Sequence, residues 1–151
     1  MRFAAVAFSP FPLSPRSRGV APLAGAAAAA ARDRAAADYV TDLRLGVLQA
    51  WTGLLNGLSR PAVDALLAPH VPGAVDFVGA IAADGEHRSE AAWRAAAALL
   101  GDVASLVTGA GEVLRARPFV RPFLQHCAGQ LPEAADSARW ALSMVERAEA
   151  A

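Results

Sequence analysis

Residues 38–59, DYVTDLRLGVLQAWTGLLNGLS, decide the fold of this 151-residue chain. Apolar side chains recur there every three or four positions, the spacing that places them on one side of an α-helix. Gly46, Gly53 and Gly57 lie within this predicted helix, and each costs about 1 kcal/mol relative to alanine. We therefore expect neighbouring helices to pack closely on the glycine face, which makes this the inner element of a stacked helical array. The apolar stripe consists of Val40, Leu43, Val47, Trp51, Leu54 and Leu58, widened by Leu48 and Leu55.

A broken helical region is expected after this helix. Over residues 62–83 an apolar pattern continues, but Pro69 and Pro72 interrupt it. Proline lacks the backbone N–H that an α-helix needs in its interior. We therefore predict a short helix over 63–68, a kink, and then a longer helix.

Three later segments complete the predicted order of helices. Ser89 is suited to cap a helix over 90–108, which ends at a pair of glycines. A fourth region over 112–127 is interrupted by two prolines, and a last helix begins near Pro132. No stretch alternates with a period of two residues, so no strand is expected.

Two leading helices carry tryptophans about forty residues apart, Trp51 and Trp93, both of which we place in the core. This spacing is near the period of roughly 40–47 residues in HEAT and armadillo repeats. The order of helix, turn and broken helix is repeated and then followed by one closing helix. The sequence therefore predicts an all-α fold, a short HEAT/armadillo-type α-solenoid of about two and a half helical-hairpin repeats, over residues 38–151.

Residues 1–37 differ in composition from the rest of the chain. They are rich in alanine, proline and arginine and contain a single acid, Asp33. We predict a low-complexity, disordered leader. An acid-poor amino end with arginine and serine is also typical of an organelle transit peptide, and this alternative stays open.

The formal charge of zero conceals an asymmetry. Residues 1–37 hold five arginines and one acid, a net charge of +4, whereas residues 38–151 hold nine arginines and thirteen acids, a net charge of −4. An acidic body disfavours nucleic acid as a partner and favours a basic polypeptide. No stretch reaches the eighteen or so apolar residues that a membrane-spanning helix needs.

The motifs that would indicate chemistry are incomplete. Gly109 and Gly111 lack the third glycine of a dinucleotide-binding loop and follow a helix rather than a strand, so they are expected to end that helix. The single cysteine is expected to be a buried, inert thiol. The histidines lie in three separate segments, which disfavours a metal site. The histidines are His70, His87 and His126, and the cysteine is Cys127. The sequence therefore predicts a protein that is not an enzyme, with no catalytic residue, cofactor or metal.

Three segments resemble importin beta, the HEAT-repeat nuclear import receptor. Residues 43–58, LRLGVLQAWTGLLNGL, resemble a helix near the carboxyl end of that family. Residues 98–104, ALLGDVA, look like its next leading helix, and ARWA at 138–141, with ERA at 146–148, is similar to its final helix. The three matches occur in the family's order, whereas residues 1–37 match nothing in it.

This resemblance implies the last two to three repeats of a longer solenoid, with no counterpart of the family's Ran-binding repeats. It implies binding of the basic helix of an importin-alpha-type adaptor, or of a basic cargo peptide, for import into the nucleus. Nucleoporins are further partners that it implies. The expected location is the cytoplasm and the nucleus, including the nuclear envelope.

The resemblance also indicates partner-binding residues. Trp140 corresponds by position to a tryptophan of the family's last helix that packs against basic side chains. Asp76 and Asp102 correspond to acids that face a basic helix. An indole attracts arginine or lysine by roughly 0.5–2 kcal/mol, which is consistent with this role for Trp140.

Two other interpretations remain. The chain could be a free-standing helical domain with a structural or assembly role, sent to an organelle by residues 1–37. It could also be a truncated array that binds nothing well, in which one side of the helix over 40–58 is uncovered and prone to association.

Overall fold

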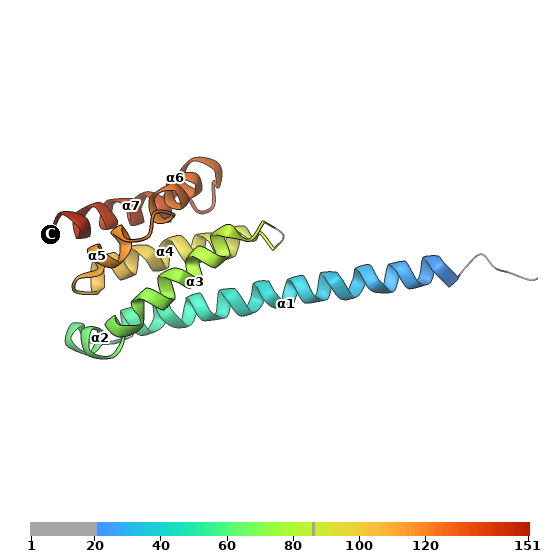
Figure 1. Ribbon diagram of the computed structural model, residues 1–151, viewed down its shortest axis with the longest axis horizontal. Helices are drawn as coiled ribbons and strands as arrows, with labels where there is room; N and C mark the ends of the chain where they lie inside the picture. Colours follow the sequence, from blue (N-terminus) through green and yellow to red (C-terminus); the bar gives the residue numbers. More distant parts are fainter. Residues whose placement is uncertain (1–20, 86) are drawn as a thin grey trace, which may run out of the picture. The chain divides into compact units, whose positions relative to one another are not determined.

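The computed structural model describes the backbone of residues 21–85 and 87–151, with side chains from Gly25 onward. Over this part of the chain the structure is helical and contains no strand, which confirms the predicted all-α solenoid fold (Figure 1). The elements are α1 (Ala21–Gly57), α2 (Arg60–Leu66), the 3-10 helix η1 (Ala68–His70), α3 (Val71–Ala83), α4 (Glu90–Leu106), α5 (Ala110–Arg115), α6 (Val120–Gln130) and α7 (Ala135–Ala150).

The chain divides into two compact units, Met1–Ala35 and Ala36–Ala151. The described part of the first unit is helical, so α1 begins at Ala21 rather than at Asp38 as the sequence predicted. Residues 21–37, which the sequence assigned to a leader, thus form the first part of α1. An unbroken alanine run lies there, and alanine has the highest intrinsic helix propensity. The remainder of the predicted leader, residues 1–20, lies outside the described residues.

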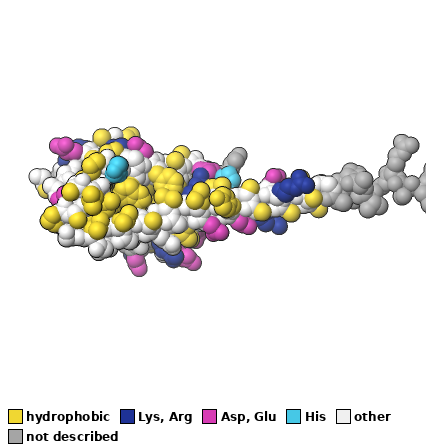
Figure 2. All heavy atoms as spheres, turned by 90° about the horizontal axis from the view of Figure 1, so that it is seen from below, with side chains coloured by type: hydrophobic (Ala, Val, Ile, Leu, Met, Phe, Trp, Pro, Cys, Tyr) yellow, Lys and Arg dark blue, Asp and Glu magenta, His cyan; other side chains and the backbone are white. Residues whose placement is uncertain are grey.

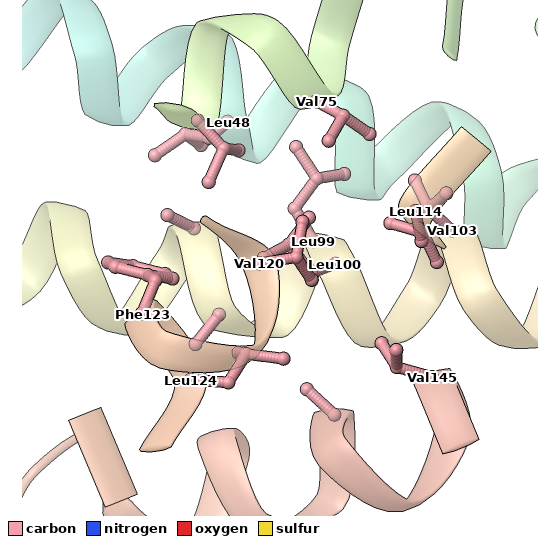
Figure 3. Close-up of a cluster of buried hydrophobic side chains, with 14 of the residues drawn as sticks. Leu48, Val75, Leu99, Leu100, Val103, Leu114, Val120, Phe123, Leu124 and Val145 are labelled. Atoms are coloured by element: carbon pink, nitrogen blue, oxygen red, sulfur yellow. The ribbon is translucent and has the colours of Figure 1, made fainter. Parts of the chain in front are cut away.

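Within the second unit the helices follow the order of a repeat array. A long helix followed by a broken helix occurs twice, as α1 with α2–α3 and as α4 with α5–α6. Helix α7 closes the array. Helix α4 contacts α3, α5, α6 and α7, and it lies between α3 and α7 in Figure 1. Its buried face carries Trp93, Leu99, Leu100 and Val103. Figure 3 shows side chains from these helices converging on α4 to form the core.

Prolines and a serine lie at the helix ends, and for Pro72 and Ser89 this agrees with the prediction. Pro61 and Pro72 lie in the first turns of α2 and α3, and the kink between these helices contains η1. The Oγ atom of Ser89 accepts a hydrogen bond from the backbone N–H of Ala92 at 3.4 Å, as an N-cap does. Gly109, with a φ of 75°, adopts the left-handed conformation that glycine tolerates best, just before α5.

The fourth predicted region needs one correction. It is broken near Pro118, where α5 has ended and α6 has not begun. Pro122, by contrast, lies in the first turn of α6 and does not interrupt it. The first N–H groups of a helix have no partner within the helix, so a proline there sacrifices no hydrogen bond.

The close packing predicted for the glycines of α1 is absent from the described part of the chain. A Cβ atom added at any of them would meet nothing within 4 Å. Three other glycines allow close approach instead, because a Cβ there would collide with an aromatic ring or with a backbone. The open glycines are Gly46, Gly53 and Gly57, and the crowded ones are Gly79, Gly101 and Gly111.

The covered side of α1 is also narrower than its apolar stripe. Leu48 and Leu55, one heptad apart, are the residues of α1 that are fully buried. Trp51 packs against the core but is only half-buried, whereas Trp93 is 8% exposed as predicted for a core residue. Leu43 and Leu54 from the same stripe are exposed. Apolar side chains accordingly spread over the face formed by α1, α2 and α3 in Figure 2.

Candidate functional site

Trp140 lies on α7 beside that helix's buried face. Ala138, Ala141 and Val145 are buried against the rest of the array, and Trp140 is 40% exposed. Its indole lies over Gly101 of α4, where an added Cβ would overlap ring atoms Cε3 and Cζ3. One part of the ring is therefore fixed by packing while another part remains available to a partner.

Asp102 follows Gly101 on α4 but faces another neighbour. Successive residues of an α-helix point about 100° apart. The Oδ2 atom of Asp102 accepts a hydrogen bond from Nδ2 of Asn56 on α1 at 3.3 Å. Partial burial raises the pKa of the Asp102 carboxyl, and hydrogen bonds from Asn56 and Thr52 oppose this effect. The charged form of Asp102, which lies between α4 and α1, is therefore less favourable in free energy than that of a fully exposed carboxylate.

Asp76 on α3 is held by an arginine. The Nε atom of Arg117 lies 2.7 Å from Oδ1 of Asp76, and Nη2 of Arg117 lies 3.1 Å from Oδ2. Arg117 also donates to the carbonyl oxygens of Pro72 and Val113, so it joins α3 to the connection between α5 and α6. The hydrogen bond from Arg117 lowers the pKa of Asp76, whose side chain is 63% exposed.

The structure does not bring these three residues together in one cluster. Trp140 packs between α7 and α4, Asp102 between α4 and α1, and Asp76 between α3 and the α5–α6 connection. Each lies where two elements of the array meet. A partner that contacted all three would have to extend across several helices.

Sequence reasoning missed an acid close to Trp140. Asp136 precedes Trp140 by four residues on α7, so both lie on the same side of that helix. The Asp136 side chain is 97% exposed and pairs with Arg139 at 2.9 Å. The spacing of four residues between an acid and an aromatic was the available signal.

Metal binding and thiol reactivity depend on the His, Cys, Asp and Glu side chains of the residues that the structure describes. Within residues 21–85 and 87–151 no three His, Cys, Asp or Glu side chains could hold a metal ion together. Cys127 is buried, and burial raises the pKa of its thiol to about 11, so the reactive thiolate is scarce at neutral pH. Among the described helices none is by itself long and apolar enough to cross a membrane; α2 with η1 and α3 would pass that test only as a bent pair.

Comparison with known proteins gives the family. The model of a family described as importin subunit beta-1-like, TPR repeats, matches residues 17–127. Importin subunit beta-1 of Arabidopsis thaliana is 27% identical over 113 residues, which cover 74% of this chain and 13% of that protein. The chain therefore spans only a small part of this curated relative.

The extent of the family match corrects one expectation and limits another. Residues 17–37 are included, although the sequence resemblance had left all of residues 1–37 unmatched. The match ends at Cys127, so α7 and Trp140 lie beyond it. With most of the chain matched, from the alanine-rich start of α1 into α6, this protein belongs to the importin subunit beta-1-like repeat family.

Proposed function

We propose that this chain is part of a nuclear transport receptor of the importin beta type and is not an enzyme. In this role it binds the basic helix of an importin-alpha-type adaptor, or a basic cargo peptide. The observation that carries the proposal is the family match over residues 17–127. The proposed locations are the cytoplasm and the nucleus with its envelope, and nucleoporins are proposed as further partners.

The charge of the repeat region supports a basic ligand. Residues 38–151 carry a net charge of −4. Several carboxylates on α7 and just before it have largely exposed side chains, among them Asp136, Glu133 and Glu146. Exposed charges attract an oppositely charged ligand over roughly one Debye length, about 8 Å at physiological salt. Binding is therefore expected to weaken as the salt concentration rises.

Trp140 is the proposed anchor for a basic side chain. The packing over Gly101 fixes the indole, so little side-chain entropy is lost when a partner binds. A guanidinium or ammonium group placed over the exposed part of the ring gains the cation–π attraction. Asp136, one turn earlier, would add an acceptor for the same partner.

Asp102 and Asp76 would contribute in different ways. Partial burial makes the charged form of Asp102 less favourable, so a cation that approaches it gains more than at a fully exposed acid. Asp76 is already paired with Arg117, so an incoming arginine must compete with that pair. We therefore rank Asp102 above Asp76 as a binding residue.

A fluorescence anisotropy titration tests the proposal. A labelled arginine-rich adaptor helix is titrated with the wild-type protein and with Trp140→Ala, at low and moderate salt. We expect a higher Kd for the variant by roughly tenfold, the loss of one partly desolvated cation–π contact. Gly129→Ala on α6, where an added Cβ meets nothing within 4 Å, is the control variant. Absence of binding at every salt concentration would contradict the proposal.

The organelle interpretation is the alternative proposal. It assigns residues 1–37 to a transit peptide, whereas in the importin-type proposal the family match takes in residues 17–37, which include the start of α1. Amino-terminal sequencing of the mature protein distinguishes the two, because a processed leader would remove the start of α1.

A further inference from the structure

A recessed surface near the amino end of α4 is lined by none of the three residues discussed above. This groove of about 370 Å³ lies between the end of α3, the start of α4 and α6. We call it the Trp93 groove. Its principal lining residues are Gly79, Arg88, Trp93, Phe119, Phe123 and His126.

The inner wall of the Trp93 groove is aromatic and well packed. Trp93 and Phe123 meet edge to face, with ring centroids 5.3 Å apart, and both residues are more than nine-tenths buried. The ring of Phe119 is pressed against Gly79, where an added Cβ would lie 2.9 Å from its Cε1 atom. The wall therefore offers an apolar surface whose shape depends on a glycine.

The outer edge of the groove is basic. The guanidinium of Arg88 lies 4.4 Å from the centre of the Trp93 ring, and Nη2 of Arg88 lies 2.9 Å from Nε2 of His126. No carboxylate of the described residues forms an ion pair with Arg88. Because arginine stays protonated, its positive charge next to an apolar wall favours a ligand that brings an anion.

The loop that leads to Arg88 is anchored on both sides. Arg44 of α1 pairs with Asp84 at 2.6 Å, and Nδ1 of His87 lies 3.1 Å from the same carboxylate. Immediately after Arg88, Ser89 caps α4. These contacts restrict the backbone from which Arg88 extends, so its charge is held near the groove.

A buried donor in the wall has no acceptor. Nε1 of Trp93 is inaccessible to solvent and makes no hydrogen bond within the described part of the chain. A buried donor without an acceptor is unfavourable, and native proteins contain few of them. A ligand oxygen that reached this N–H would relieve the deficit.

We propose that the Trp93 groove binds a peptide segment in which an aromatic or aliphatic side chain stands next to a carboxylate. The apolar side chain packs on Trp93, Phe119 and Phe123, and the carboxylate pairs with Arg88. The volume is near the lower end of ligand pockets, about 300–1,000 Å³, which suits one large side chain and its neighbour. This site goes beyond the proposed function, because its ligand is acidic and its residues differ from Trp140, Asp102 and Asp76.

Nuclear magnetic resonance of the three indole N–H groups tests this site in the full chain. The probe is a short peptide with a Phe-Asp pair, compared with matched peptides carrying Phe-Asn or Ala-Asp. We expect the Phe-Asp peptide to shift the Trp93 signal far more than those of Trp51 and Trp140. The Phe-Asn and Ala-Asp peptides are expected to bind at least roughly fivefold more weakly, as when one ion pair or one anchor is lost.

Two glycine variants on α3 provide the matched protein control. Gly79→Ala must displace the Phe119 ring, whereas an added Cβ at Gly73 meets nothing within 4 Å. We expect Gly79→Ala to weaken the peptide by about tenfold and Gly73→Ala to leave its Kd unchanged. Arg88→Gln, an exposed substitution that leaves the core intact, should weaken binding by roughly fivefold. An unshifted Trp93 signal at saturating peptide, or equal binding to all three peptides, would overturn the proposal.

Discussion

The indole of Trp140 rests on Gly101, across the interface between α7 and α4. A methyl group on residue 101 would overlap two ring atoms, so the absence of a side chain there permits the contact. Trp140 is nevertheless 40% exposed, so the same contact fixes the proposed anchor and leaves it accessible. Stability of the interface and orientation of the anchor are therefore linked through one glycine.

Gly101→Ala should destabilise the protein and misplace the anchor. Overpacking of a close contact typically costs about 1–3 kcal/mol. Urea denaturation should show this loss in the free energy of unfolding, and the Kd for the arginine-rich helix should rise. Gly129→Ala, which adds the same methyl group in open space, should do neither. Equal stability of the two variants would show that the indole moves away freely.

Gly111→Ala should destabilise the protein more than Gly101→Ala. Its Cβ would collide with the carbonyl group of Ala148 on α7, and a backbone cannot rotate away as an indole can. We expect a loss above the usual range for overpacking, about 3 kcal/mol or more, together with detachment of the end of α7. Hydrogen exchange over residues 135–150 would locate the change. Protection of α7 equal to that of the wild type would contradict the expectation.

Gly53→Ala should stabilise the protein by about 1 kcal/mol, the difference in helix propensity. Nothing described lies within 4 Å of a Cβ at this position on α1, so the substitution brings no clash. Thermal and urea denaturation of dilute protein would measure the gain. A loss of stability would instead mean that another chain packs against the glycine face in solution.

Asp102→Asn should raise the stability at pH 7. The folded-state pKa of Asp102 lies above the ordinary value of 3.8, so the native protein holds the proton more tightly than the unfolded chain. Stability therefore falls as the pH rises through this window, and the whole cost is present above the folded pKa. The gain from asparagine should vanish as the pH falls to 3.8 or below. Urea midpoints of both proteins at pH 7 and pH 3.5 would measure this difference in stability. An Asp102→Asn variant less stable than the wild type at pH 7 would refute the prediction.

Arg117→Ala should destabilise the protein by about 1–2 kcal/mol, because two backbone carbonyls and Asp76 lose their donor. Asp76→Asn should have a smaller effect, since this carboxylate is exposed and keeps water as a partner. Urea denaturation of both variants measures the difference. A larger loss of unfolding free energy for Asp76→Asn than for Arg117→Ala would contradict the role of Arg117 in linking α3 to the α5–α6 connection.

Local signals in the sequence predicted the helices well. Ser89, Pro61, Pro72 and Gly109 act at helix ends through their own backbone and side-chain chemistry, which neighbours in space alter little. The same argument failed for Pro122, because it ignored that a proline is harmless in a first turn. The start of α1 was missed because proline and arginine nearby outweighed the alanine run in the interpretation of residues 1–37.

Contacts between distant residues could not be predicted in this way. Periodicity indicates that α1 has apolar and glycine-rich sides, but it does not indicate which neighbour covers them. Asp76 and Arg117 are 41 positions apart in the chain, so no local pattern predicts that they pair. Gly101 was noted only as part of ALLGDVA, although its packing role depends on Trp140, far along the chain.

The most direct test of the central claim is the response of the three indole N–H signals to an arginine-rich adaptor helix at low salt. We predict that the Trp140 signal shifts with saturation, that those of Trp51 and Trp93 move little, and that the shift is reversed by added salt. An unchanged Trp140 signal at saturating peptide, or a shift of Trp93 alone, would contradict the assignment of a basic-helix site to the α4–α7 surface.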